Sequence, residues 1–394
     1  MGNKVYIAGA VRTPIGKMGG SLSTVSAGEL GAVVIREALN RSGILPEQVD
    51  EVLMGCVLQA GLGQNIARQS SLKAGIPISV PASTVNMVCG SSLKAVNMAA
   101  ALISSGQTDI VVAGGTESMS NAPFLLQKAR FGYRMNNGTL VDSMVNDALW
   151  DAFNDCHMGI TAENIAEQYG ISRLEQDRFA AESQQKCQRA RELHKFDDEI
   201  IPVEVKQGKK SFIFAEDEGP RDGITAEGIG GMKPAFKPDG SVTAANASGI
   251  NDGAAAVVLI SEKKAAELGI TPMAEFIAGT SAGVSPEVMG IGAGVSAKKL
   301  LDMLGKSAQD MTLIEANEAF ASQSIASAAI GGWDRMMDKV NVNGGAISLG
   351  HPVGASGCRI LVTLLYELKR RGGGTGLATL CIGGGMGVSA VVKV

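Results

Sequence analysis

Short apolar runs alternate with helical patterns along the first third of the chain. Val5–Ala10 is a run typical of a strand, whereas Gly28–Ser42 spaces its apolar residues along one face of a helix. The same patterns predict further strands at Val49–Val57, Ser83–Val88 and Asp109–Gly115, and further helices at Asn65–Ala74 and Ser91–Ser105. Such alternation predicts an α/β fold with a mostly parallel sheet and helices packed on it.

The last third of the chain repeats this plan. Matching elements are expected in the same order, with strands at Ala274–Ala278, Met311–Ala316, Lys339–Asn343 and Gly376–Gly383, and helices at Ala297–Leu304 and Ser356–Arg371. The closing run Gly387–Lys393 resembles Asp252–Leu259, so Ala254–Ile260 is the expected last strand of the first half. The pattern therefore predicts two similar α/β halves.

A long insert separates that last strand from the rest of the first half. It contains the polar helical pattern Ser172–His194 and the turn-rich stretch Glu216–Gly240. Long connections inside compact domains are usually functional covers over a site. We predict an N-terminal half of residues 1–118 and 248–270, a loop domain of residues 119–247 over the site, and a C-terminal half of residues 271–394.

Composition narrows the class of protein. With 394 residues, 45% hydrophobic and 19% charged, the chain is expected to be a soluble globular protein of more than one domain. A net charge of −4 without a basic arm argues against nucleic-acid binding. No signal peptide, membrane-length apolar stretch or peroxisomal tripeptide is found, so we expect a cytoplasmic location and no membrane partner.

The six cysteines are scattered without CxxC spacing. This distribution excludes the usual zinc patterns and does not resemble a secreted disulfide framework. We therefore expect no metal site and a reducing compartment.

One cysteine, within Val85–Lys94, lies at a predicted turn from a strand into a helix. An apolar run reaches Cys89, a glycine follows at once, and a small-residue helix begins. A thiol at such a turn lies near unpaired backbone N–H groups and the positive end of the helix dipole, and both favour the thiolate. A buried cysteine acting as a small hydrophobe is the commoner alternative.

The repeat places other chemical groups at equivalent points. His351 follows Gly345–Gly350 at the turn that matches Cys89, Asn317 follows the strand that matches the second strand, and Cys381 ends the strand that runs into Gly383. Ligands bind outside the carboxyl ends of strands in open α/β sheets. A thiol, a histidine base and amide donors suit acyl chemistry, although a histidine alone is often a satisfied loop residue.

Four segments together resemble the signatures of the thiolases: Asn86-Met-Val-Cys-Gly-Ser91, Asn317-Glu-Ala-Phe320, Gly344-Gly-Ala-Ile-Ser-Leu-Gly-His-Pro352 and Cys381-Ile-Gly-Gly-Gly-Met-Gly387. The resemblance covers nearly the whole chain. It implies a five-layer αβαβα fold of two similar halves with an inserted loop domain. It also implies a reversible thioester-dependent Claisen condensation by a homo-oligomer, either a dimer or a homotetramer built as a dimer of dimers.

The resemblance assigns roles by matching position. It implies that Cys89 is the nucleophile that becomes acetylated, and that His351 activates it and polarises a thioester oxygen together with a water held by Asn317. Cys381 would remove the α-proton of the second acetyl-CoA. The N–H groups of Cys89 and Gly383 would form an oxyanion hole. Coenzyme A thioesters are substrates in this ping-pong scheme, and no separate cofactor is expected.

The resemblance also implies contacts to coenzyme A. His157 and Met158 look like the pocket residues of the short-chain, biosynthetic type, and Met289 matches another wall of the acyl pocket. Ser248 matches a contact to the pantetheine amide, and Arg221 matches a basic residue near the nucleotide. Both segments also have explanations without a role in binding. The residues after His157 are typical of a capped helix start, and Arg221 is explained equally well as a surface arginine without a ligand.

Two segments depart from the family pattern. Gly292–Ala297 lacks the two prolines that many relatives have there, which is expected to loosen the edge of the acyl pocket. Tyr133 and Arg134 lie where residues of the oligomerising loop vary among relatives, so a tetramer is less strongly indicated than a dimer.

The expected reaction converts two acetyl-CoA into acetoacetyl-CoA and CoA. A broader-chain 3-ketoacyl-CoA thiolase of fatty-acid β-oxidation is the alternative within the family. A condensing enzyme of the ketoacyl-synthase kind uses histidine where this chain has Cys381. A non-catalytic CoA- or lipid-binding relative would be free to lose Cys89 or His351, and the partial glycine motif Gly290–Gly294 is weak evidence for dinucleotide binding.

Overall fold

The computed structural model describes residues 2–394, and one ten-stranded sheet runs through both halves. The strands of the first half are β1 (Val5–Arg12), β2 (Gly16–Lys17), β3 (Glu51–Gly55), β4 (Ala82–Val85), β5 (Ile110–Ser118) and β12 (Asn251–Ser261). Those of the second half are β13 (Ala274–Gly283), β14 (Leu313–Ala316), β15 (Thr375–Ile382) and β16 (Met386–Lys393). The order is β14-β15-β16-β13-β1-β12-β5-β3-β4, with β2 beside β12, so the halves mirror each other about the β13–β1 junction.

The sheet is mixed, and the prediction of a mostly parallel sheet is wrong. β3 runs parallel to β4 and β5, and β14 runs parallel to β15. β1, β12, β13 and β16 pair antiparallel with their neighbours. Parallel strands need a crossover, whereas β15 and β16 are joined by the short glycine turn Gly383–Gly385 and must run antiparallel.

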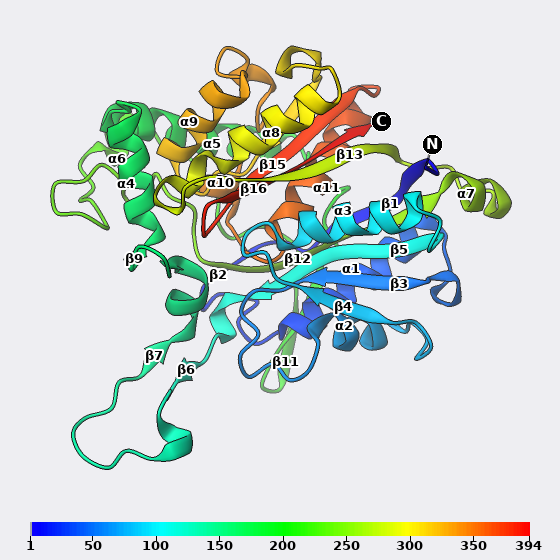
Figure 1. Ribbon diagram of the computed structural model, residues 1–394, viewed down its shortest axis with the longest axis horizontal. Coiled ribbons are helices and arrows are strands. Elements are labelled where there is room, and N and C mark those ends of the chain that lie inside the picture. The colour runs from blue at the N-terminus through cyan, green and yellow to red at the C-terminus, as the bar shows by residue number, and fades with distance from the viewer. Residues whose placement is uncertain (1) are drawn as a thin grey trace.

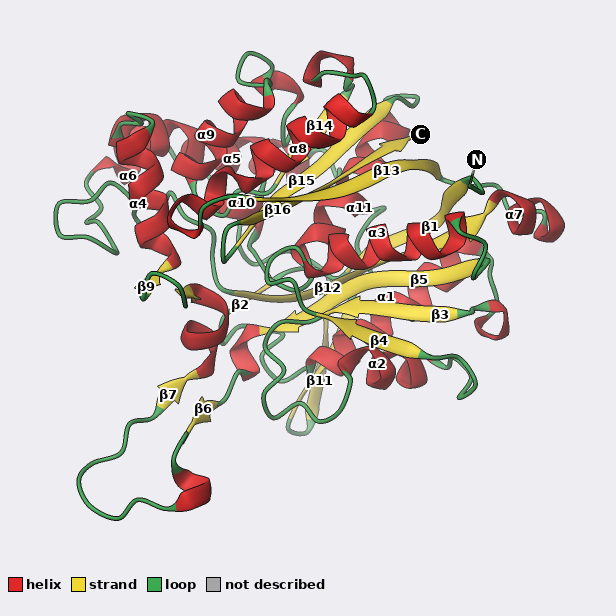
Figure 2. Ribbon diagram, viewed as in Figure 1, coloured by secondary structure: helices red, strands yellow, loops and turns green. Residues whose placement is uncertain are grey.

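The helices form three layers around the two halves of the sheet (Figures 1 and 2). α1 (Ala27–Ser42) and α2 (Ile66–Ala74) cover the outer face of the first half, and α8 (Gly292–Met303) and α9 (Ala321–Gly331) cover that of the second. α3 (Ser91–Ser104) and α11 (Ser356–Arg370) contact each other and strands of both halves, and form the middle layer. The predicted five-layer αβαβα fold is confirmed.

Local signals in the sequence set several helix ends. Ser26 accepts a hydrogen bond from the N–H of Glu29, whose carboxylate accepts the N–H of Ser26 in return, and this capping box starts α1. Gly43 ends the same helix with a φ of 70°. Asn65 caps α2 through the N–H of Arg68. These ends therefore lie within one residue of the predicted ones.

The strand predicted at Lys339–Asn343 is wrong. Only Val340 pairs with the sheet, through a single bridge to Ile314, and a 3₁₀ turn precedes it. Asn341 has a φ of 44°, which breaks the extended backbone. Its side chain accepts the N–H of Ala316 at 2.9 Å and donates to the carbonyl of Ala316 at 2.8 Å, so an amide replaces the expected backbone ladder.

The residues between β5 and β12 add no strand to the ten-stranded sheet. They form β6 (Phe124–Leu125), β7 (Val141–Asp142), β8 (Trp150–Asp151), β9 (Cys156–His157), β10 (Val203–Gln207) and β11 (Lys210–Phe214), with helices α4 (Met158–Gln168), α5 (Arg173–Glu192) and α6 (Ala226–Gly230). The stretch between β6 and β7 projects from the body as a long arm (Figure 1). The three-part domain division, with boundaries at 118, 247 and 270, stays a prediction.

Two short helices complete the chain, α7 (Glu262–Leu268) after β12 and α10 (Ala346–Leu349) before His351. Among the helices of residues 2–394, none combines the length and the apolar character that crossing a bilayer requires.

Candidate active site

A cavity of about 470 Å³ opens between the two halves and the inserted segment. Six residues singled out in the sequence line it, namely Cys89, His157, Met158, Ser248, Met289 and His351. They come from the β4–α3 turn, the start of α4, the loops before β12 and α8, and the loop before α11. The fold thus brings together residues that are up to 262 positions apart (89 to 351).

Cys89 sits in a strained turn, Met87–Gly90, which we call the Cys89 turn. Val88 has a φ of 46°, a conformation that is costly for a β-branched residue. The hydroxyl of Ser91 accepts the N–H of Met87 at 2.9 Å and donates to the carbonyl of Val88 at 2.6 Å, which closes the turn. Such strain persists only where the surroundings over-determine it, and here it presents the thiol to the cavity.

The environment of Cys89 keeps it protonated at neutral pH. Burial raises the pKa of the Cys89 thiol to about 11, although the N–H groups of Gly383 and of Cys89 itself face the sulfur and favour the thiolate. The turn between β15 and β16 carries Gly383, so the second half supplies one of the two donors. Two converging N–H groups at one point are the geometry of an oxyanion hole.

His351 lies six per cent exposed in the loop Gly350–Ser356, which we call the His351 loop. Its Nδ1 lies 2.6 Å from the hydroxyl of Ser356, which itself donates to the carbonyl of Pro352 at 2.9 Å. Because that hydroxyl proton is engaged, the oxygen accepts from Nδ1–H, and Nε2 is left as the unprotonated nitrogen. Nε2 has no hydrogen-bond partner within residues 2–394.

Burial, together with the positive charge of Arg359, lowers the pKa of His351 to about 3. The imidazole is therefore neutral at physiological pH and its free nitrogen is able to accept a proton. Asn251 fixes the loop from the other side, since its Oδ1 accepts the N–H of His351 at 2.9 Å and its Nδ2 donates to the carbonyl of Gly16.

Cys381, Asn317 and Gly383 lie behind the wall of the cavity. Cys381 is one per cent exposed and packs in a cluster with Met158, Met289 and Phe320, which line the cavity. Burial and the nearby Cys89 raise the pKa of its thiol. Both polar atoms of the Asn317 side chain are buried with no partner among the described residues, so this amide is free to hold a water molecule.

The part of the cavity where the sequence predicts the acyl pocket is apolar. Met158 and Met289 are buried in its wall, and the ring of His157 stacks on Phe236 with centroids 4.6 Å apart. Phe320 meets Phe236 edge to face at 6.2 Å. Nδ1 of His157 accepts the N–H of Gly159, which caps α4, so the residue both starts a helix and lines the cavity.

The two remaining coenzyme A candidates differ in position. Ser248 lines the cavity, and its backbone N–H donates to the carbonyl of Ala319 at 2.9 Å. Arg221 is exposed and does not line the cavity, and its backbone N–H donates to Gln184. Six of the ten candidates therefore line the cavity, three lie behind its wall, and Arg221 lies on the surface outside.

Three residues of this region were missed from the sequence. Ser356 and Asn251 hold the His351 loop, and the buried Glu117 joins that loop to the first half through the N–H of Gly354. A glutamate at the end of the apolar run Asp109–Gly115 was a usable signal, because a buried charge needs partners. The contacts of Ser356 and Asn251 had no local signal.

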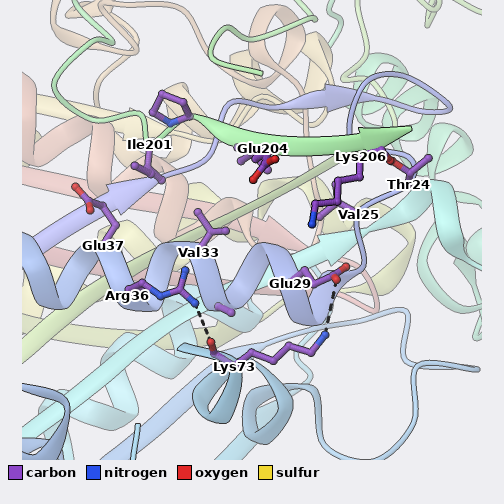
Figure 3. A pocket seen from close by; sticks show the side chains of 13 residues that line it. Thr24, Val25, Glu29, Val33, Arg36, Glu37, Lys73, Ile201, Glu204 and Lys206 are labelled. Carbon is purple, nitrogen blue, oxygen red and sulfur yellow. Dashed lines mark hydrogen bonds and ion pairs between the residues drawn. The ribbon is translucent and has the colours of Figure 1, made fainter. Parts of the chain in front are cut away.

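A second hollow of about 630 Å³ lies elsewhere, between α1 and β10 (Figure 3). Its walls carry charges of both signs, with Lys73 4.0 Å from Glu29 and Arg36 donating to the carbonyl of Lys73. None of the candidate cysteines or histidines lines it. Within residues 2–394, no group of His, Cys, Asp or Glu side chains has the arrangement of a metal site.

Comparisons with known proteins agree with this geometry. The family models "Thiolase, N-terminal domain" and "Thiolase, C-terminal domain" match residues 5–263 and 270–394. The chain is 56% identical to an acetyl-CoA acetyltransferase of Syntrophomonas wolfei over all of both chains, and 56% identical to one of Cupriavidus necator over 99% of each. The crystal structure of the Bacillus anthracis acetyl-CoA acetyltransferase superposes with a TM-score of 0.97 at 45% identity, covering 100% of this chain and 99% of that one.

Proposed function

The chain belongs to the thiolase family, and from that premise we propose that it is an acetyl-CoA C-acetyltransferase. It is an acyltransferase that joins two acetyl-CoA into acetoacetyl-CoA and CoA, and runs the same reaction in reverse. The observation that carries this proposal is the meeting of Cys89 and a free imidazole nitrogen of His351 at one apolar cavity, with the N–H of Gly383 facing the Cys89 sulfur.

In the first half-reaction, the sulfur of Cys89 attacks the carbonyl of acetyl-CoA. Nε2 of His351 takes the thiol proton, and the C–S bond to coenzyme A breaks as the proton passes to the departing thiolate. A water held by Asn317, together with the protonated His351, stabilises the negative oxygen. The products are acetyl-Cys89 and CoA.

In the second half-reaction, Cys381 removes a proton from the methyl carbon of another acetyl-CoA. The resulting carbanion attacks the carbonyl carbon of acetyl-Cys89, and the oxygen gains its charge beside the N–H groups of Cys89 and Gly383. The C–S bond to Cys89 then breaks and acetoacetyl-CoA leaves. The proton that Cys381 removed passes to the Cys89 sulfur, which restores the Cys89 thiol. The position of Cys381 among Met158, Met289 and Phe320 supports this role.

The apolar walls favour short acyl chains. Met158, Met289 and Phe320 are all at most 8% exposed, so a long acyl chain at this wall would have to displace buried side chains. Coenzyme A would enter past Ser248, with Arg221 outside the cavity as a contact for phosphate. No separate cofactor belongs to this mechanism.

The proposal includes a homo-oligomer, as a dimer or a homotetramer, in the cytoplasm. Support comes from the arm between β6 and β7, which exposes Phe131 and Met135 at 88% and 85%. Apolar side chains this exposed mark an interaction site.

Thiolysis of 3-ketoacyl-CoA substrates tests the proposal. We expect turnover of acetoacetyl-CoA plus CoA to exceed that of a C8 or longer 3-ketoacyl-CoA, because a long acyl chain would have to displace buried side chains. Cys89→Ala is expected to lower kcat at least about 1,000-fold, since the nucleophile is lost. Cys156→Ala, which removes the other partly exposed thiol, is the matched control and keeps activity.

Equal or faster turnover of the longer substrate would contradict the short-chain assignment. Activity that survives in Cys89→Ala would contradict the nucleophile and, with it, the ping-pong scheme.

A further inference from the structure

Glu117 is a buried carboxylate that the mechanism does not use. It lies near the end of β5 with none of its surface exposed, and it does not line the cavity. Its two oxygens accept three backbone N–H groups, from Val57 at 2.9 Å, Leu58 at 3.1 Å and Gly354 at 2.8 Å. The thiol of Cys56 lies 3.6 Å from the same carboxylate.

The third of these donors comes from the other half of the molecule. Gly354 belongs to the His351 loop and follows His351 by three positions. A Cβ at Gly354 would collide with Oε2 of Glu117 and lie 3.0 Å from Cα of Cys56, so backbone meets carboxylate with no side chain between. The carbonyl of Gly354 packs as closely on Gly55 and Gly115, where added Cβ atoms would also collide with it.

Val57, another of these donors, contacts residues next to Cys89. The carbonyl of Val57 is in reach of Nδ2 of Asn86 at 3.5 Å, and Oδ1 of Asn86 accepts the N–H of Val88 at 3.0 Å. Val57 and Val353 also pack in one apolar cluster, against which Cys89 lies. Glu117 therefore touches one loop that supports the Cys89 turn and one loop that carries His351.

We propose that Glu117 is a positioning residue that holds the His351 loop in register with the Cys89 turn across the boundary between the halves. Three N–H groups on one carboxylate fix three backbone points, and two of those points belong to the first half while the third belongs to the second. Burial raises the pKa of Glu117 to about 7, and above that pH the ionised carboxylate accepts these N–H groups in charge-assisted bonds, which are stronger than neutral ones. The inference rests on the proposed function, because it concerns the alignment of the nucleophile Cys89 with its base His351.

Glu117→Gln tests this inference. Glutamine keeps the size of the side chain but has one acceptor oxygen, so at least one of the three N–H groups faces an NH₂ group and loses its partner. We expect kcat for acetoacetyl-CoA thiolysis to fall about ten- to a hundredfold with KM changed less than about twofold, because a displacement near 1 Å of a reacting group costs about that much.

The control is Glu199→Gln, which alters another fully buried carboxylate. Glu199 accepts from Arg12 and Thr363 and contacts neither the His351 loop nor the Cys89 turn. It is expected to lower the melting temperature but leave kcat unchanged. A loss of kcat that is equal in the two variants and follows their melting temperatures would overturn the inference, as would unchanged kcat in Glu117→Gln.

A second readout does not depend on the proposed reaction. The rate at which iodoacetamide alkylates Cys89 at pH 8, with the site identified by mass spectrometry, reports on the Cys89 turn without any thioester. We expect this rate to change in Glu117→Gln, where loss of the Glu117 charge also lowers the pKa of Cys89, and to stay unchanged in Glu199→Gln. If Glu117→Gln does not fold, Glu117→Asp, which keeps the charge and both oxygens on a shorter side chain, is expected to slow the alkylation of Cys89, and an unchanged rate would overturn the inference.

Discussion

Cys89 and His351 both line the cavity, and both side chains are neutral at physiological pH. Burial raises the pKa of the thiol to about 11, and burial with the charge of Arg359 lowers the pKa of the imidazole to about 3. Transfer of the proton from sulfur to nitrogen is therefore unfavourable in the empty site. It becomes favourable only as bond formation to the thioester carbon removes charge from the sulfur, which is the condition for general-base catalysis.

The raised pKa of Cys89 predicts how the rate of its alkylation depends on pH. Below about 11 the thiolate fraction grows about tenfold for each pH unit, so the rate of inactivation by iodoacetamide should rise from pH 6 to pH 9 without levelling off. Stopped-time alkylation of wild-type protein measures it, with Cys89→Ala giving the background from Cys156. A rate that reaches its plateau by pH 7 would instead indicate a preformed thiolate–imidazolium pair.

At the scale of elements, the Cys89 turn connects strand β4 to helix α3. The helix begins at Ser91 without a side-chain cap, because its N-cap residue is Gly90. The Ser91 hydroxyl instead points back into the turn and binds Met87 and Val88. A Cβ at Gly90 would collide with Ile382 of β15, so the turn also packs against the strand that carries Cys381. The hydroxyl of Ser91 thus holds the turn that carries the Cys89 thiol and does not cap the helix.

Ser91→Ala should loosen this turn. The N–H of Met87 loses its acceptor, which we expect to cost about 1–3 kcal/mol of unfolding free energy and to slow alkylation of Cys89. Ser105→Ala, which removes an exposed hydroxyl bound to Leu102 at the opposite end of the same helix, is the control and should cost less than about 0.5 kcal/mol. Urea unfolding of both variants measures the difference. Equal stability of the two would show that the Ser91 hydroxyl does not hold the turn.

At the scale of the whole molecule, a buried cation joins the inserted segment to the first half. Arg12 at the end of β1 binds Glu199 at 2.6 Å and Asp217 at 2.7 Å, and all three side chains are at most 2% exposed. Its guanidinium also lies over the ring of Phe196 at 5.2 Å. Both carboxylates belong to the residues between β5 and β12, so this cluster anchors residues 196–217, none of which lines the cavity, to β1.

Arg12→Met should release that anchor. Two buried carboxylates would be left without their cation, and we expect a loss of about 3–5 kcal/mol of unfolding free energy with faster proteolysis near residues 195–220. The exposed pair of Arg191 and Asp222 supplies the control, since Arg191→Ala should cost at most about 1 kcal/mol. Thermal unfolding and limited proteolysis measure both, and an undisturbed cleavage pattern in Arg12→Met would refute the anchoring role.

Periodicity and turn signals were sufficient for most elements, because each depends on neighbours in the chain. The helices at Asn65–Ala74 and Ser356–Arg371 and the strand at Gly376–Gly383 were each predicted to within one residue of their ends. The strand at Lys339–Asn343 was not, since the Asn341 side chain competes for the hydrogen bonds of Ala316. Its apolar–polar alternation is genuine, but a tertiary contact decides the backbone.

The sequence by itself determined the two halves, the insert and the chemical groups, because apolar spacing and residue identity are local properties of the chain. It also placed Cys89 at a turn before a helix and His351 at the matching turn. Only the tertiary structure decided which residues hold those groups. Glu117, Asn251 and Ser356 act through contacts made when the halves pack, and burial in that packed state separates the pKa of Cys89 from that of His351.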